Sequence, residues 1–380
     1  MQTQPYPIMP QALHNEWSRC SFVQSFKFHL AQKVRPGNRD AFEREVVPAF
    51  KKAKGRVPGD RHEVRRAMLQ NEHYRMWGTL QRTSQEMLWH SALDTVERES
   101  GRVIAVAQHP ARTRGSLTLK KGLKAPRYIA DVDIHAMPGS YCGDASDEDV
   151  STGAIFDYGV QWYTSPYVAG LGGRGSLGTN RGAHMAAFLK HVYPDLKPKR
   201  ILDIGCTVGH STIAIQDAFP QAEVHAIDAG AGMLRYAHAR ASELGRPIHF
   251  AQQDAEAMDY PDGHFDLIVS HILLHEVSRK ATQRIMKECF RLLTPGGVCA
   301  HQDVSLFAGM SPFDAFEADW DTYNNNEPCW GQMRETDGIA LMTRAGFARD
   351  RVHQTWVPHG TPEFRDTPVG NATYTLSARK

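Results

Sequence analysis

Residues 200–211 read RILDIGCTVGHS, and this stretch decides the fold of the chain. Its apolar run predicts a buried strand that stops at Gly205, and a helical pattern opens directly after Gly209. Glycines between a strand and a helix let a ligand approach the backbone where side chains would block it. The stretch therefore predicts a strand, a ligand-binding loop and the N-terminus of a helix.

Two aspartates stand at the ends of the next two predicted strands. Asp228 ends the strand 224–228, roughly 20 residues beyond the loop, where a carboxylate can accept hydrogen bonds from both hydroxyls of a ribose. Asp254 follows the strand 248–251 and can accept a hydrogen bond from an adenine amino group. Each aspartate can alternatively cap the helix that follows it. Because both stand at the ends of adjacent strands, we favour an adenosine-bearing cofactor.

The second half of the chain alternates strands and helices, which predicts an α/β fold with a doubly wound parallel sheet covered by helices on both faces. A ligand then binds at the carboxyl ends of the strands. The remaining predicted strands are 265–270, 298–304, and 352–357 with 373–377 as a closing hairpin. The predicted helices are 211–218, 234–244, 281–292 and 339–345.

Composition excludes several functional classes for this chain of 380 residues, which is long enough for two domains. The 44 lysines and arginines nearly balance the 42 aspartates and glutamates, so charge gives no reason to expect nucleic acid or a membrane surface as partner. No run of about 18 apolar residues occurs, and residues 1–20 lack the pattern of a signal peptide. The six scattered cysteines predict a reducing, cytoplasmic location.

Residues 1–185 have a different pattern and predict a mainly helical accessory domain, with a role in binding substrate or in forming a homodimer. The spacing of residues 83–86 is that of a capping box, and apolar residues then recur up to Gly101, so one helix is expected here. The other expectations are helices within 37–76, strands at 103–108 and 116–120, and irregular structure over 137–182.

Six segments together resemble the class I S-adenosylmethionine-dependent methyltransferases of the small-molecule type, related to the ubiquinone and menaquinone methyltransferases. These segments are 201–206 with Gly209, 224–228, 253–256, 265–270, 274–276 and 291–297. The resemblance implies a Rossmann-like, seven-stranded domain over residues 186–380, with S-adenosylmethionine (SAM) as cofactor and S-adenosylhomocysteine as product. A nicotinamide cofactor fits less well, because the loop lacks the G-x-G-x-x-G spacing.

The resemblance also implies roles for individual residues. They are Asp203 for orienting the loop and the methionyl amino group, Gly205, Cys206 and Gly209 for the loop itself, Asp228 for ribose, Asp254 and Ala255 for adenine, Ser270 or His271 for the methionyl ammonium, and Tyr158 for closing over the cofactor or acceptor. The chain departs from the family at Thr207, where a glycine is usual. A β-branched residue reaches positive φ only at a cost, so either the loop differs locally or the cofactor sits slightly shifted.

Three histidines are candidates for acid–base catalysis: His271, His275 and His301. An imidazole near the strand ends can take a proton from a hydroxyl as the methyl group arrives, so oxygen is favoured over carbon as the acceptor atom. Alternatively, His275 is a common family residue without a catalytic role, and His301 is a satisfied polar group at the sheet edge. His271 and His275 are spaced like a zinc pair if their turn is helical, but no third ligand is evident and no metal site is expected.

The insert 306–331 is rich in aromatic residues and amides. This composition suits a lid over a small, partly apolar acceptor, and it suits a helical layer or a dimer surface equally well. The sequence therefore predicts a methyltransferase acting on a small organic molecule. The alternative is a catalytically altered relative that binds SAM for another reaction, such as a cyclisation, or for a regulatory role.

Overall fold

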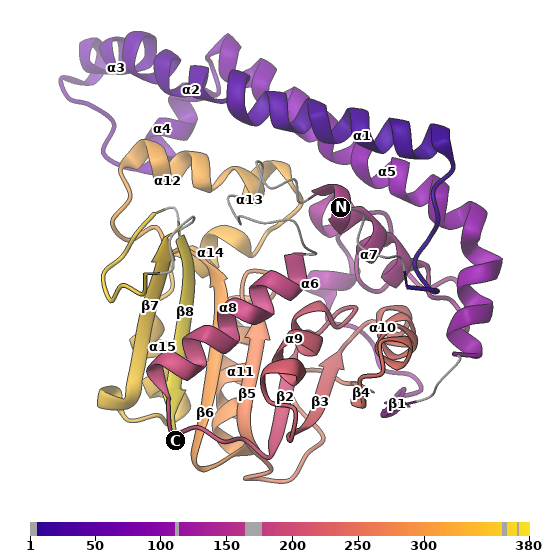
Figure 1. The fold of residues 1–380 in the computed structure, drawn as a ribbon. Coiled ribbons are helices and arrows are strands. Elements are labelled where there is room, and N and C mark those ends of the chain that lie inside the picture. Colours follow the sequence, from indigo (N-terminus) through magenta and orange to yellow (C-terminus); the bar gives the residue numbers. More distant parts are fainter. Residues whose placement is uncertain (1–5, 111–113, 164–176, 359–362, 371) are drawn as a thin grey trace.

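The computed structural model describes residues 6–110, 114–163, 177–358, 363–370 and 372–380 (Figure 1). At its centre lies an eight-stranded sheet of order β1-β4-β3-β2-β5-β6-β8-β7. Neighbouring strands from β1 to β6 run parallel, whereas β8 is antiparallel to both β6 and β7. The strands are β1 (Ser116–Thr118), β2 (Arg200–Ile204), β3 (Glu223–Asp228), β4 (Ile248–Gln252), β5 (Phe265–His271), β6 (Leu293–Val304), β7 (Val352–Pro358) and β8 (Ala372–Arg379).

Helices cover both faces of this sheet. Successive residues of a strand point to opposite faces, and apolar residues stand on both of them. Ile201 packs into the same cluster as residues of α8, α9 and α10, whereas Leu202 and Ile204 pack with residues of α11 and α15. The helices that follow β2 are α9 (His210–Ala218), α10 (Ala231–Glu243), α11 (Arg279–Leu292), α12 (Pro312–Ala318), α13 (Trp320–Asn324), α14 (Trp330–Arg334), α15 (Gly338–Ala345) and the 3₁₀ turn η4 (Arg349–Arg351).

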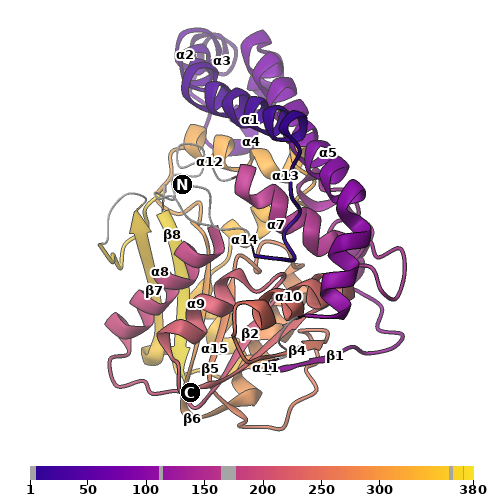
Figure 2. The same cartoon turned by 45° about the vertical axis from the view of Figure 1, so that its right-hand side comes forward.

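Most of the helices before β2 form a layer across one end of the sheet (Figures 1 and 2). Helices α1 and α5 lie side by side, and cluster residues of α4 and α5 pack against Phe313, Phe316 and Trp320 of the insert. The helical elements of this layer are α1 (His14–His29), η1 (Leu30–Val34), α2 (Pro36–Ala41), η2 (Phe42–Val46), α3 (Val47–Lys54), α4 (Arg61–Met68), α5 (Glu72–Gln108), α6 (Arg127–Ala130), η3 (Ile134–Ala136) and α7 (Ser151–Tyr163). Helix α8 (Leu177–Val192) also precedes β2, but it packs on a face of the sheet beside α9. No helix in the described part of the chain is both long enough and apolar enough to cross a bilayer.

The doubly wound α/β fold predicted for the second half is confirmed, with an eighth strand added. That strand, β1, comes from the N-terminal part and pairs with β4 beyond the seven expected strands. The prediction was wrong about the helix that contains residues 83–101. This helix, α5, has 37 residues and begins after Asn71, whose side chain accepts a hydrogen bond from the Tyr74 amide. A capping motif inside a helix cannot start it, so neighbouring packing decided the boundary.

Two further local predictions for the part of the chain before β2 were wrong. Residues 103–108 continue α5 instead of forming a strand, and the range 137–182, expected to be irregular, contains α7 and the start of α8. Residues 103–108 and α7 lie in the helical layer, where partners far away in the sequence bury their apolar residues. Residues 164–176 of this range lie outside the described residues.

The loop after β2 keeps a glycine-like conformation throughout, although it contains Thr207. The φ angles are +71° at Gly205, +46° at Thr207 and +77° at Gly209. The Thr207 amide donates a hydrogen bond to Oδ2 of Asp228 at 2.9 Å, which ties the loop to the end of β3. The left-handed conformation costs a non-glycine residue about 1–2 kcal/mol. Thr207 therefore adopts the left-handed conformation at a cost, and the loop does not avoid positive φ at this position.

Thr207→Gly should relieve this strain. We expect the free energy of unfolding to rise by about 0.5–1 kcal/mol, because the relief exceeds the extra backbone entropy of glycine in the unfolded chain. Urea unfolding measures the change. The exposed Thr343 of α15 gives a matched control, since Thr343→Gly introduces glycine into an ordinary helix and should lower stability by ~0.3 kcal/mol. A loss of stability at position 207 equal to that of the control would refute strain in the loop.

Asp203 lies on the same strand face as Ile201 and attaches β2 to α9. Its side chain is 1% exposed, and its Oδ2 accepts a hydrogen bond from Oγ1 of Thr212 at 2.6 Å. Burial raises the pKa of Asp203 to about 7. The native protein therefore holds a proton that the unfolded chain releases at lower pH. The stability due to this proton is fully present below the unfolded pKa and is lost as the pH rises through the folded pKa.

Asp203→Asn should remove this dependence on pH, because the amide oxygen still accepts from Thr212 and cannot ionise. Between about pH 4 and pH 7, wild-type stability should fall relative to the variant by at most ~1.4 kcal/mol per pH unit. Urea unfolding of both proteins across this range gives the difference. Parallel stability curves would mean that Asp203 does not titrate there.

Candidate active site

A cavity of about 280 Å³ lies at the carboxyl edge of the sheet, under the helical layer. One wall comes from the loops after β2, β3 and β4, and the facing wall comes from the helical layer and the insert. The first wall includes Gly205, Thr207, Asp228, Asp254 and Ala255. The second includes Trp89, His135, Tyr141, Phe156, Glu327 and Trp330. Parallel sheets place ligands at this edge, so the cavity is the candidate active site.

The two predicted aspartates both reach the cavity. Asp228 is 9% exposed, and its two oxygens accept hydrogen bonds from the amides of Thr207 and Gly230, each at 2.9 Å. Burial raises the pKa of Asp228, and these amides oppose the rise. The N-cap of α10 is Gly230, so Asp228 is not the capping residue. Asp254 Oδ1 accepts from the Glu256 amide at 2.9 Å. Both carboxylates are thus held by backbone amides at the cavity edge.

Other predicted residues support the site from outside the cavity lining. Asp203, Cys206, Gly209 and Ser270 lie in or beneath the loop, and none of them lines the cavity. Among the histidines, His301 is likewise buried: its Nδ1 lies 2.8 Å from Oγ of Ser270. Burial lowers the pKa of His301 to about 4. These side chains are therefore positioned to hold the strand ends in place.

Tyr158 points away from the cavity, contrary to the sequence prediction. Its hydroxyl lies 4.0 Å from Sγ of Cys20, within the helical layer. Phe156 and Val160, spaced by four residues, line the cavity instead. Tyr158 stands two residues after Phe156, and two residues advance a helix by more than half a turn. The sequence located the right aromatic segment but could not give the rotation of α7.

The candidate histidines after β5 are separated by a turn that is not helical, so the condition for their sharing one helical face is not met. Ile272 has a φ of +59°, and the two imidazoles have different partners. His271 lines the cavity with its Nε2 at 3.0 Å from Oε1 of Gln302. His275 is buried and its Nδ1 lies 2.6 Å from Oδ1 of Asp303. His271 and His275 therefore do not form a pair, and each imidazole has its own hydrogen-bond partner.

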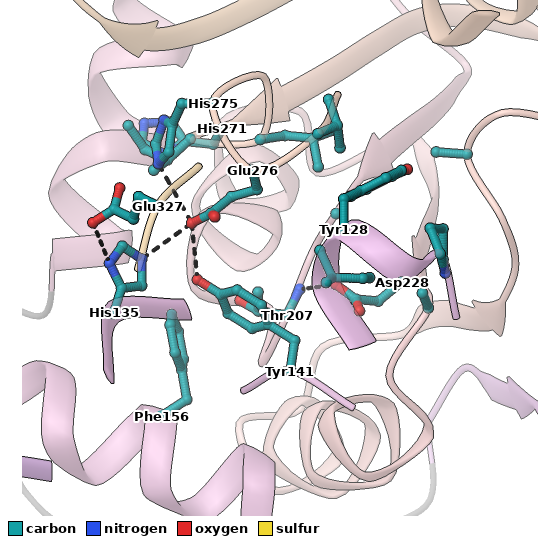
Figure 3. Close-up of a pocket in the computed structure, with 18 of the residues that line it drawn as sticks. Tyr128, His135, Tyr141, Phe156, Thr207, Asp228, His271, His275, Glu276 and Glu327 are labelled. Atoms are coloured by element: carbon teal, nitrogen blue, oxygen red, sulfur yellow. Dashed lines mark hydrogen bonds and ion pairs between the residues drawn. The ribbon is translucent and has the colours of Figure 1, made fainter. Parts of the chain in front are cut away.

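A cluster of buried polar side chains surrounds Glu276 (Figure 3). Its Oε1 lies 3.1 Å from the Tyr141 hydroxyl, 3.0 Å from Nε2 of His135 and 3.4 Å from Nε2 of His275. On its other side, His135 presents Nδ1 to Oε1 of Glu327 at 2.8 Å. The cluster joins three separate parts of the chain: the helical layer, the loop after β5 and the insert.

The charges of this cluster are strongly coupled. Although burial opposes the change, the carboxylates of Asp303 and Glu276 raise the pKa of His275 to about 10. Glu327 and Glu276 likewise raise the pKa of His135 well above its usual value, against its burial. Burial alone would raise the pKa of Glu276, but both imidazoles hold it below its usual range. The cluster is thus a place where charge and protons are held out of contact with water.

Backbone strain concentrates around the same cavity. His135 has a φ of +58°, and it lines the cavity together with Thr207 and Ile272, which also have positive φ. Each such residue costs on the order of 1–3 kcal/mol and persists only where its surroundings fix it. In His135 the carbonyl accepts hydrogen bonds from Gln85 and Trp89 at 2.9 Å, so α5 holds this strained turn in position.

Sequence reasoning missed four residues of the facing wall: His135, Tyr141, Phe156 and Glu327. Glu327 follows the asparagine run of the predicted lid, and Phe156 stands in the aromatic segment that was noticed, so both had a signal. His135 and Tyr141 lie in turns of the helical layer with no local motif. Their place became evident only from the fold.

Comparisons with known proteins match the part of the chain around the sheet. A family described as a methyltransferase domain matches residues 201–297. A malonyl-(acyl-carrier protein) O-methyltransferase of Methylococcus capsulatus is 34% identical over 131 residues, which cover 34% of this chain and 45% of that protein. A demethylmenaquinone methyltransferase of Thermus thermophilus is 32% identical over 100 residues, which cover 26% of this chain and 44% of that protein. The chain therefore spans less than half the length of these two relatives.

The solved structure of a SAM-dependent methyltransferase from Aquifex aeolicus is 19% identical, with a TM-score of 0.34, and the match covers 50% of this chain and 88% of that one. The family match is more informative than this structure. Its residues 201–297 run from β2 into β6 and include the glycine loop, Asp228 and Asp254. Residues 201–297 of this chain therefore match the methyltransferase domain family.

Proposed function

We propose that this protein transfers a methyl group from SAM to an oxygen atom of a small organic acceptor. The observation that carries the proposal is the continuity of one cavity from Asp228 at the end of β3 to the cluster around Glu276. Methyl transfer to a hydroxyl needs a held cofactor, an aligned acceptor and a group that handles the proton. One cavity here provides candidates for all three.

The residues at the sheet edge fit SAM. We assign the Asp228 carboxylate to the ribose hydroxyls and Asp254 to the adenine amino group, because both carboxylates line the cavity at adjacent strand ends. Space over the loop is limited, since a Cβ on Gly205 would lie 2.7 Å from Cδ1 of Leu273. When bound, SAM supplies a methyl group on a sulfonium centre that is already electrophilic.

The facing wall fits a partly apolar acceptor. Trp89, Tyr141 and Phe156 come from residues 1–185, so we assign this helical part a role in binding the acceptor. The insert 306–331 closes the same wall with Glu327 and Trp330. The relative named demethylmenaquinone methyltransferase supports a small organic acceptor, and the relative named malonyl-(acyl-carrier protein) O-methyltransferase supports oxygen as the acceptor atom.

The chemistry of the chain's own residues is alignment and removal of a proton. The attacking oxygen forms a bond to the methyl carbon, the carbon–sulfur bond breaks, and its electron pair stays on sulfur. We assign the proton of the acceptor hydroxyl to His271, which lines the cavity. Its Nε2 donates to Oε1 of Gln302, so the neutral imidazole carries its lone pair on Nδ1.

Asp228→Ala should weaken the binding of S-adenosylhomocysteine by roughly 1.5–3 kcal/mol, the range for hydrogen bonds to a charged group. Isothermal titration calorimetry measures the affinity. The exposed Asp350, which lies outside the cavity lining, gives a control variant, Asp350→Ala, that should bind like the wild type. Unchanged affinity in folded Asp228→Ala would remove this residue from the cofactor site.

His271→Ala should leave the affinity for S-adenosylhomocysteine intact and slow methyl transfer at least ~100-fold, since it removes the general base. The assay incubates the protein with methyl-labelled SAM and a pool of hydroxyl-bearing metabolites, and follows labelled product. An unaltered rate would assign the base elsewhere. Tight binding of the cofactor by the wild type without any labelled product would instead favour the non-transferring alternative.

A further inference from the structure

The two imidazoles beside Glu276 are held in the same way. In His275, Nδ1 faces the Asp303 carboxylate at 2.6 Å; in His135, Nδ1 faces the Glu327 carboxylate at 2.8 Å. Each ring therefore turns its Nε2 toward Oε1 of Glu276, at 3.4 Å and 3.0 Å. A carboxylate on one ring nitrogen fixes the orientation of the ring and so the direction of its other nitrogen. Two rings fixed in this manner converge on a single carboxylate.

Three polar atoms of this cluster lack a hydrogen-bond partner within the described part of the chain. They are Nε2 of His275, Oε2 of Glu276 and Oε2 of Glu327. The three side chains are 1%, 7% and 1% exposed, so water does not compensate them freely. Unsatisfied buried atoms are rare, and several in one place indicate a group that binds there.

We propose that this cluster binds a divalent transition-metal ion, with Nε2 of His135, Nε2 of His275 and the Glu276 carboxylate as its ligands. One ligand atom each from these residues and Glu327 lie within 4.8 Å of one another. In a tetrahedral zinc site, ligand atoms about 2.0–2.1 Å from the ion lie ~3.3 Å apart, close to the separations from Glu276 given above. The two separations from Glu276 already match such a site, and the wider separations, up to 4.8 Å, shorten as the ion binds.

The donor set selects the class of metal. Two imidazoles and one carboxylate suit Zn²⁺, Fe²⁺, Co²⁺ or Mn²⁺, whereas Mg²⁺ and Ca²⁺ prefer oxygen ligands alone. Three protein ligands leave a position for a further ligand, which is typical of a catalytic site. Asp303 and Glu327 then act as the outer carboxylates that orient the two histidines. From the sequence no metal site was expected, because no third ligand was evident. The fold brings His135 and Glu276 to His275 and so completes a set of three ligands.

The remaining position would face the cavity, because His135, His275 and Glu276 all line it. The Tyr141 hydroxyl donates a hydrogen bond to Glu276, and the Tyr141 backbone packs beside Gly230, two residues after Asp228. This tyrosine therefore extends from the metal ligands to the loop after β3. Resting on the proposed methyl transfer, the ion would bind the acceptor's oxygen, position it and make its hydroxyl more acidic. The substrate class is then a hydroxyl compound able to coordinate a metal.

The test measures metal separately from activity. Untagged protein is stripped with a chelator, loaded with Zn²⁺ or Co²⁺, and analysed by elemental content, calorimetry and the visible absorption of bound Co²⁺. We expect one ion per chain. His135→Asn keeps a residue that tolerates positive φ, and Glu276→Gln keeps the shape of the side chain; each should weaken binding at least tenfold. Asp303→Asn should weaken it ~10- to 100-fold.

Two control variants separate the possible outcomes. His225→Asn changes a histidine whose ring lies 5.2 Å from that of His249, outside the cavity lining, and should keep the full metal content. Asp228→Ala should lose affinity for S-adenosylhomocysteine and keep the metal. Absence of a bound ion in the wild type, or loss of the ion in His225→Asn with retention in His135→Asn, would overturn the proposal. Metal bound without methyl transfer would leave the site standing and refute the proposed function.

Discussion

The burial of the Glu276 carboxylate is the interaction on which the arrangement of this molecule depends. A carboxylate 7% exposed is tolerated only if charged or polar partners surround it. Its partners come from the helical layer, through His135 and Tyr141, and from its own loop, through His275. The partners of this one buried charge therefore join the N-terminal part of the chain to the loop at the carboxyl edge of the sheet. That part covers the open sheet edge and turns it into a cavity.

The sheet-edge side of the cavity was predictable from the sequence, because its determinants are local. The glycine loop, Asp228 and Asp254 each stand next to the strand that positions them, and strand ends in a parallel sheet meet at one edge. The order of strands and helices from β2 onward was likewise readable from apolar periodicity. The conformation of Thr207 was not predictable from the sequence, because a hydrogen bond to a residue 21 positions away holds this strained residue in place.

The other side of the cavity depends on contacts that no local pattern records. His135 lies in a strained turn whose carbonyl is fixed by Gln85 and Trp89 of α5, and it meets Glu327 across 192 positions of sequence. Tyr158 failed as a prediction for a related reason, because the rotation of α7 is set by its packing against α5 and α10. Long-range burial of charge and rotation of helices are tertiary effects, so they appear only in the folded chain.

The central claim is that one cavity holds the cofactor at the sheet edge with its reactive end toward the buried cluster. A crystal structure with S-adenosylhomocysteine bound tests this claim most directly. The account predicts the ribose beside Asp228, the adenine beside Asp254, and the sulfur directed toward Glu276 and its two histidines. A cofactor bound outside this cavity, or one whose sulfur points away from that cluster, would contradict it.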